Sequence, residues 1–132
     1  MRTFRFRAWV KPLQKMAQVY TLGLTGIEGT TVSVDGQLRC GLDWRTMELM
    51  QFAGLLDKNG KEIWEGDIVR YRDEIGDVRW SHRRCGFRVF VGHKKPQESK
   101  TYSVAFTGGE VNPNIEVIGN IYEDDYLLNQ SK

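Results

Sequence analysis

The sequence predicts a mostly-β protein, with an N-terminal β lobe, a small barrel and a short C-terminal helical turn. Short apolar segments alternate with turns rich in Gly, Asp and Asn along the whole chain. The 132 residues include 14 Gly, 4 Trp, 6 Phe and 5 Tyr, a composition that favours short strands joined by tight turns. A chain of this length can bury a core without a disulfide or a metal ion.

The N-terminal lobe is expected to contain five strands. Residues 3–9 alternate between Phe4, Phe6 and Ala8 on one face and more polar side chains on the other, which is typical of a half-buried strand. Residues 46–52 suit a helix or a strand, but they lack a helix cap and a helical period, so a strand is expected. The strands expected in this lobe are residues 3–9, 16–22, 30–34, 37–40 and 46–52.

The middle of the chain predicts a hairpin. Asp57 begins the sequence Asp-Lys-Asn-Gly, where its carboxylate can accept a hydrogen bond from the backbone two residues on. Gly60 suits the left-handed position of such a turn. Leu55 and Ile63 give the two arms apolar side chains to bury. A second turn at residues 65–67 then leads into the next strand.

The C-terminal half predicts an SH3-like barrel, in which strand closure removes exposed edges. Five short strands are expected at residues 68–71, 78–80, 87–91, 102–106 and 116–121. They are separated by residues 73–76, 81–86, 92–100 and 107–114. Residues 123–128 suit a terminal helical turn, because carboxylates are favourable at its positive end. The predicted organisation is one compact unit, with residues 1–65 as the N-terminal lobe and residues 66–132 as the barrel and terminal turn.

Net charge is +2, but the charges are unevenly distributed. Residues 1–22 carry five basic and no acidic side chains, whereas residues 108–132 carry one basic and five acidic side chains. Such blocks can pair within the chain or with a second copy. No apolar run approaches the roughly 18 residues of a membrane span, and residues 1–7 do not suit a signal peptide. Cys40 and Cys85 are therefore expected as reduced thiols in a cytoplasm.

A basic segment with interleaved aromatic residues is the strongest candidate for a binding site. Arginine side chains bind phosphates and stack on bases, and exposed aromatic rings offer platforms for bases. The alternative is a solvated hairpin whose arginines pair with the acidic C-terminal segment, while Trp80 and Phe87 fill the barrel. The candidate nucleic-acid-binding residues are Arg79, Arg83, Arg84, Arg88, Lys94 and Lys95.

Other kinds of chemistry find little support in the sequence. The spacing of Cys40, His82, Cys85 and His93 matches no zinc-site pattern. Cys85 and His82 lack an acidic residue that would orient them for nucleophilic catalysis. We therefore expect no catalytic residues, metal, cofactor or small-molecule substrate. Trp44, in a polar loop, is expected at the surface as a candidate protein contact.

Four motifs resemble those of the YopX family of phage and prophage proteins. They are Phe-Arg-Ala-Trp at residues 6–9 with Lys-Met at 15–16, Gln-Phe-Ala-Gly-Leu at 51–55, the segment 57–69, and Val-Ile-Gly-Asn-Ile-Tyr-Glu at 117–123. Residues 23–45 and 81–112 match no pattern that we can state. The resemblance implies a mostly-β protein with an SH3-like barrel in its C-terminal half and a phage origin. It implies no activity and no catalytic residues.

Two functional hypotheses follow. The first is a non-enzymatic phage or prophage accessory protein that acts through contact with a host or phage protein or through self-association. The absence of a catalytic motif and the complementary charge blocks favour it. The alternative is a nucleic-acid-binding SH3-like module that uses the basic hairpin.

Overall fold

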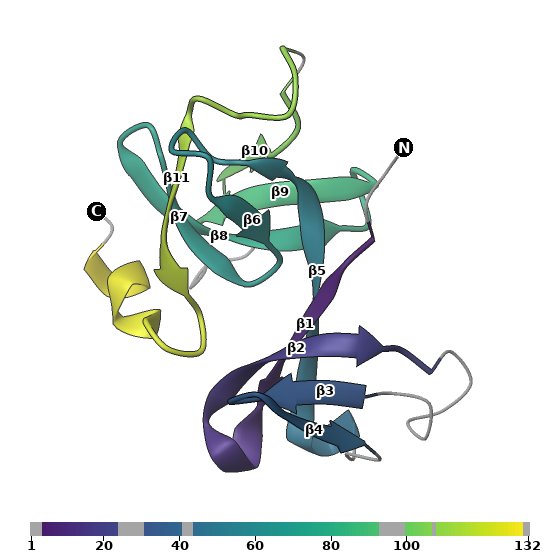
Figure 1. The fold of residues 1–132 in the computed structure, drawn as a ribbon. Coiled ribbons are helices and arrows are strands. Elements are labelled where there is room, and N and C mark those ends of the chain that lie inside the picture. The colour runs from purple at the N-terminus through teal and green to yellow at the C-terminus, as the bar shows by residue number, and fades with distance from the viewer. Residues whose placement is uncertain (1–3, 24–30, 41–43, 93–99, 107, 131–132) are drawn as a thin grey trace. The chain divides into compact units, whose positions relative to one another are not determined.

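The computed structural model describes residues 4–23, 31–40, 44–92, 100–106 and 108–130, and it confirms the mostly-β prediction (Figure 1). The strands form two antiparallel sheets. Among these residues the helical elements are short 3-10 turns. No helix in the described part of the chain is long and apolar enough to span a membrane.

The first of two compact units comprises Thr3–Gln51. Its strands lie in the order β4-β3-β2-β1-β5, and each adjacent pair is antiparallel. The 3-10 turn η1 (Lys11–Leu13) joins the first two strands. The strands are β1 (Phe6–Val10), β2 (Lys15–Thr21), β3 (Thr31–Val34), β4 (Gln37–Cys40) and the first half of β5 (Met47–Leu56). Residues 46–52 therefore belong largely to a strand, as the sequence predicted.

The core of this unit lies on one face of its sheet. Val10, Val32 and Met47 are buried there, and Ala8 faces Ala17 across β1 and β2. The opposite face of β1 is not simply polar, because it carries Trp9, which is only 5% exposed. Phe4 precedes β1 and is 63% exposed, so the first strand starts later than the alternation predicted.

The second unit contains Phe52–Lys132. The second half of β5 pairs with β6 (Glu62–Trp64), and a five-stranded sheet follows in the order β10-β9-β8-β7-β11. Its strands are β7 (Asp67–Tyr71), β8 (Glu74–Ser81), β9 (Gly86–Val91), β10 (Lys100–Ser103) and β11 (Ile115–Asn120). The strand count is that of an SH3-like barrel, although β10 and β11 do not pair with each other. The 3-10 turn η5 (Asp125–Gln130) confirms the predicted C-terminal helical turn.

Two boundaries differ in position from the sequence-based expectation. The units divide inside β5, whereas the sequence analysis placed the boundary near Glu65 and Gly66. The expected separator at residues 73–76 is also shorter in the structure. Tyr71 pairs with Glu74, so only Arg72 and Asp73 form the turn. Arg72 adopts a left-handed conformation (φ 54°), which lets the chain reverse in two residues.

The core of the second unit is made of β-branched side chains from most of its strands. At most 1% of each of these residues is exposed, and half-buried Ala53, Leu55 and Phe87 pack against them. Gly76 lies so close to the Phe90 carbonyl that a Cβ atom would be 2.4 Å from its oxygen. The core residues are Ile63, Val69, Val78, Val89, Val104 and Ile115.

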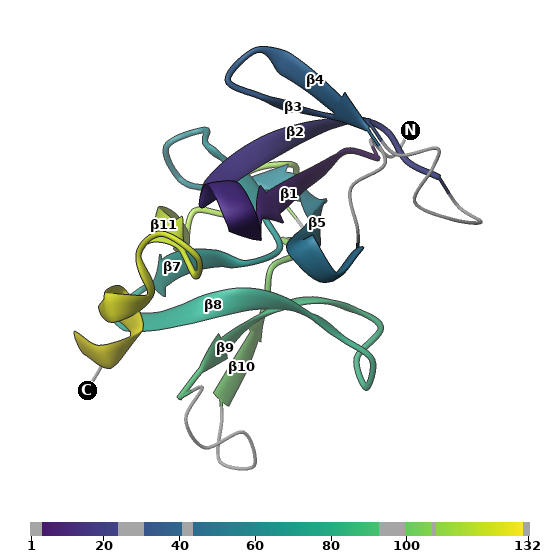
Figure 2. The same cartoon turned by 90° about the horizontal axis from the view of Figure 1, so that it is seen from below.

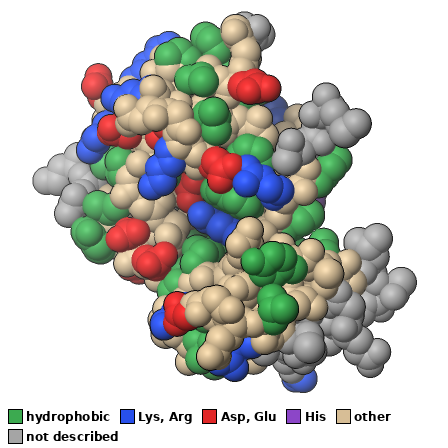
Figure 3. Space-filling model, viewed as in Figure 1, with side chains coloured by type: hydrophobic (Ala, Val, Ile, Leu, Met, Phe, Trp, Pro, Cys, Tyr) green, Lys and Arg blue, Asp and Glu red, His purple; other side chains and the backbone are tan. Residues whose placement is uncertain are grey.

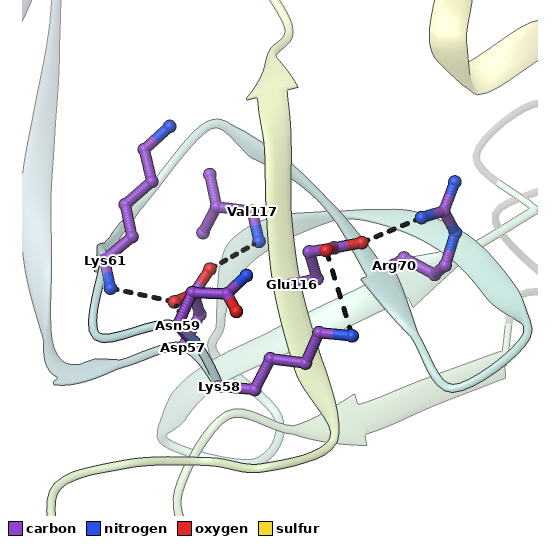
Figure 4. A network of polar contacts seen from close by, with 7 residues as sticks. All are labelled: Asp57, Lys58, Asn59, Lys61, Arg70, Glu116 and Val117. Atoms are coloured by element: carbon purple, nitrogen blue, oxygen red, sulfur yellow. Dashed lines mark hydrogen bonds and ion pairs between the residues drawn. The ribbon is translucent and has the colours of Figure 1, made fainter.

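Buried Asp57 connects the predicted hairpin turn to the last strand (Figure 4). Its Oδ1 accepts hydrogen bonds from the backbone N–H groups of Asn59 (2.9 Å) and Lys61 (2.8 Å). Its Oδ2 accepts one from the N–H of Val117 on β11 (2.9 Å). Gly60 has the left-handed conformation expected for this turn (φ 81°). The carboxylate thus satisfies donors from two segments that are far apart in the sequence.

Glu116, next to Val117, forms ion pairs with two basic side chains (Figure 4). Its carboxylate lies 2.8 Å from Arg70 Nη1 and 3.8 Å from Lys58 Nζ. About half of each basic side chain is exposed, so these pairs contribute at most about 1 kcal/mol each. The buried hydrogen bonds of Asp57 therefore make the larger contribution to this contact.

The Asp57→Ala variant tests this connection. The change leaves three backbone donors without their acceptor, and each such loss typically destabilises a protein by about 1–3 kcal/mol. We expect the free energy of unfolding to fall by about 3 kcal/mol or more in denaturant titrations. Asp57→Asn, which keeps the shape but loses one acceptor oxygen, should have a smaller effect of the same sign. Asp73→Asn, at an exposed turn position, is the control; an effect as large as that of Asp57→Ala would contradict the assignment.

A tyrosine pair joins β10 to β7 of the same sheet. The rings of Tyr71 and Tyr102 stack with 4.2 Å between centroids. The Tyr102 hydroxyl donates a 2.5 Å hydrogen bond to Glu74 Oε1. This hydrogen bond raises the pKa of Tyr102 above its ordinary value of 10.0, because the phenolate would lose the bond and would lie beside a carboxylate.

Alkaline titration tests this contact. Because the pKa of Tyr102 is higher in the folded state than in the unfolded chain, its contribution to stability is complete below pH 10 and is lost as the pH rises through the folded pKa. An ultraviolet titration should show a late step, in which a tyrosine ionises above the ordinary value of 10.0. Glu74→Gln should move that step to lower pH, and Tyr102→Phe should remove it. A late step that survives Tyr102→Phe would refute the assignment.

Candidate functional site

The basic segment identified in the sequence forms the hairpin of β8 and β9, which is defined here as the basic hairpin (residues 79–88). Arg79 faces Arg88, Trp80 faces Phe87, and the pair of Ser81 and Gly86 closes the strands. Residues 82–85 form the connecting turn. Figure 2 shows this turn at the far end of the long twisted ribbon formed by β8 and β9.

The turn of the basic hairpin is held in one conformation by local contacts. The hydroxyl of buried Ser81 accepts a hydrogen bond from the backbone N–H of Arg84 (3.2 Å). Cys85 adopts a left-handed conformation (φ 52°), and its Sγ lies 3.6 Å from the His82 carbonyl oxygen. The turn therefore presents exposed His82, Arg83 and Arg84 on an ordered backbone.

Arg79 and Arg88 have contacts within the fold. Arg79 forms a two-pronged ion pair with buried Asp77, through Nε (2.6 Å) and Nη2 (3.1 Å). Its guanidinium also lies 5.0 Å from the centre of the Phe90 ring. Arg88 donates from Nε to Thr101 Oγ1 (2.9 Å) and from Nη2 to the Thr101 carbonyl (3.2 Å), which fastens β9 to β10. Contacts within the protein therefore fix the orientation of the Arg79 and Arg88 side chains.

Arg83 and Arg84 differ from this pair. Both side chains are exposed, and no ion pair is found for either within the described residues. Acidic residues near the C-terminus have other contacts, because Glu116 pairs with Lys58 and Arg70. On the face of the Phe52–Lys132 unit seen in Figure 3, basic and acidic side chains lie beside one another. The hairpin tip is a different environment, with two cations close together.

Trp80 is partly exposed rather than fully enclosed by the barrel. Trp80 lies on the same face of β8 as the core residue Val78 but two residues closer to the hairpin turn. The core ends at Val78, so Trp80 lies beyond it. Its ring contacts Phe87 edge to face, with 5.2 Å between centroids, and 40% of the residue remains exposed. The hairpin thus carries an accessible aromatic ring near its basic tip.

A pocket of about 290 Å³ opens beside the basic hairpin. Ala53 and Leu55 of β5 line it together with Phe87, and the lining also includes Arg84 and Arg88. Ser103 at the end of β10 and the next two residues, Val104 and Ala105, are also part of the lining. The sequence analysis did not predict this pocket, because its residues come from segments that are distant in the sequence and carry no common motif.

Five other residues considered in the sequence analysis have side chains outside the described part of the structure. Lys94 and Lys95 lie outside the described residues, as does His93. Trp44 begins the 3-10 turn η3 (Trp44–Thr46), but its side chain is outside the described part, as is that of Cys40. Among the described residues there is no group of three or more His, Cys, Asp or Glu side chains suited to a metal ion.

Comparisons with known proteins agree with the fold. The family model described as YopX protein matches residues 5–129. The crystal structure of protein EF1440 from Enterococcus faecalis is similar, with a TM-score of 0.62, 22% identity and coverage of 97% of this chain and 99% of that chain. The structure of protein yopX from Bacillus subtilis has a TM-score of 0.57 with the same identity and coverage. A comparison with curated proteins found no significant match.

The structure defines a small mostly-β protein that carries an ordered basic hairpin. The match over residues 5–129 shows that the chain belongs to the YopX family, as its motifs indicated. The two solved structures support the same fold.

Proposed function

We propose that this protein is a non-enzymatic nucleic-acid-binding protein of a phage or prophage, which acts through its basic hairpin. One observation carries the proposal: Arg83 and Arg84 are exposed on an ordered turn close to the accessible ring of Trp80. Residues 78–92 contain no Asp or Glu that would repel a polyanion. Arginine favours phosphate through its forked guanidinium, and aromatic rings stack on bases.

The order of the hairpin turn supports this function energetically. A turn that is already held by Ser81 and by the left-handed Cys85 loses little conformational freedom when a ligand binds. The ion pair of Arg79 with Asp77 and the contact of Arg88 with Thr101 stiffen the strands below the turn. The turn therefore holds Arg83 and Arg84 at a nearly fixed spacing, which favours binding of a partner.

Contact with a protein partner or a second copy is the second candidate. It is favoured by exposed apolar side chains in the Thr3–Gln51 unit, where Tyr20 is 59% and Leu38 is 67% exposed, and by the position of β4 at the edge of its sheet. Charge gives it less support than the sequence suggested. Lys11 pairs with Glu48, and Lys15 pairs with Asp35, within the same unit.

Charge reversal at the hairpin tip tests the first proposal. We expect the native protein to bind short DNA or RNA oligonucleotides at low salt, with an affinity that falls as salt rises. The double variant Arg83→Glu and Arg84→Glu should bind at least about tenfold more weakly. It should also lower the slope of log affinity against log salt by about two, since two phosphate contacts are lost. Fluorescence anisotropy titrations at several salt concentrations measure both quantities.

A matched control variant makes an equal change in net charge outside the basic hairpin. Arg39→Glu with Lys61→Glu reverses two exposed basic residues outside the hairpin and should change the affinity much less. Equal losses in the two double variants, or no binding of the native protein at micromolar concentration, would refute the proposal. A change of oligomeric mass in the hairpin variant, measured by light scattering, would instead favour the second candidate.

A further inference from the structure

The pocket beside the basic hairpin has the chemistry of a binding site for a flat, uncharged group next to an anion. Its walls include the aliphatic side chains of Ala53 and Leu55 and the aromatic ring of Phe87. None of the lining residues is acidic. Its volume of about 290 Å³ lies at the lower end of small-ligand sites, which makes it suitable for a single ring system rather than an extended ligand.

One exposed arginine, Arg84, gives this pocket a positive charge. Arg88 follows Phe87 in β9, so its side chain leaves the opposite face of the strand, where two hydrogen bonds to Thr101 hold it. Arg84 lines the pocket, and its exposed side chain extends from the turn that Ser81 holds. A ligand in the pocket would therefore have its anionic part near the hairpin tip.

Polar groups for recognition are also present. Ser103 lines the pocket, and its Oγ accepts a hydrogen bond from the backbone N–H of Ala105 (3.2 Å). This contact uses the Ser103 oxygen as an acceptor and leaves the hydroxyl proton available as a donor. The pocket thus combines apolar walls for a ring, a hydroxyl donor for the ring edge and the Arg84 cation for phosphate.

Building on the proposed function, we propose that this pocket receives one unstacked base of a single-stranded nucleic acid, while Arg84 binds a phosphate beside that base. The apolar walls bury the faces of the base, and the positive charge matches the polyanionic backbone. The bases of a duplex are stacked inside the helix and cannot enter a pocket of this kind. The protein therefore binds single strands in preference to duplexes.

The first measurement compares the native protein with single-stranded and duplex oligonucleotides of the same sequence. We expect single strands to bind roughly tenfold or more tightly, because stacking contributes about 1–3 kcal/mol per base. A 2-aminopurine base in the single strand should change its fluorescence when the protein binds, since the base moves from its stacked neighbours into the pocket. This readout does not depend on any variant folding.

The second experiment uses a substitution that fills the pocket. Ala105 is exposed and lines the pocket, so Ala105→Trp adds bulk there without disturbing the core. This variant should lose the preference for single strands and the 2-aminopurine signal, while it keeps the weaker, salt-dependent binding to duplex. Pro113→Trp, at an exposed position outside the pocket lining, is the matched control and should behave like the native protein.

The outcomes separate this inference from the proposed function. Equal binding of single strands and duplexes, with no 2-aminopurine signal and no effect of Ala105→Trp, would overturn the base-pocket inference and leave the role of Arg83 and Arg84 in place. No binding of either nucleic acid would overturn both proposals. A preference for single strands that is lost in Ala105→Trp and kept in Pro113→Trp would support both.

Discussion

The structure of the second unit depends on one buried carboxylate. Asp57 accepts hydrogen bonds from its own turn and from Val117, 60 residues later in the sequence. Three backbone hydrogen bonds lie close to this carboxylate. The N–H of Leu56 donates to the Glu110 carbonyl, that of Asn112 to the Leu56 carbonyl, and that of Lys58 to the Ile115 carbonyl. Together these contacts fix the end of β5, and Leu55 at that end lines the pocket beside the basic hairpin. The constraint that closes the fold therefore also shapes the candidate site.

The arginines of the basic hairpin divide into two groups by their contacts. Arg79 and Arg88 lie opposite each other on β8 and β9 and are bonded to Asp77 and Thr101, so they stiffen the hairpin. Arg83 lies at the turn and is exposed. A hairpin that keeps its strand arginines occupied and its turn arginines accessible can bind an anion without losing strand pairing. This division is the physical basis of the proposed function.

Much of the fold could be predicted from the sequence because its signals are local. The turn at Asp57 and Gly60 depends on side-chain and backbone preferences within four residues, and the strands follow from short apolar alternation. The third hydrogen bond of Asp57, to Val117, could not be predicted, because it depends on the position of β11. The exposure of Trp80 also escaped prediction, since sequence alternation gives the face of a strand but not where the core beneath it ends. The same limit hid the pocket, which forms only when β5, β9 and residues 103–105 come together.

Native-state hydrogen exchange of the amides bonded to Asp57 tests the central claim most directly. If this carboxylate is the junction of the second unit, the amides of Asn59, Lys61 and Val117 exchange only when the unit unfolds. Their opening free energies should then match one another and that of the core amide of Val89. Exchange of Val117 well before the core, at a different opening free energy from Asn59 and Lys61, would contradict the account, because β11 would then detach from the turn while the unit stayed folded.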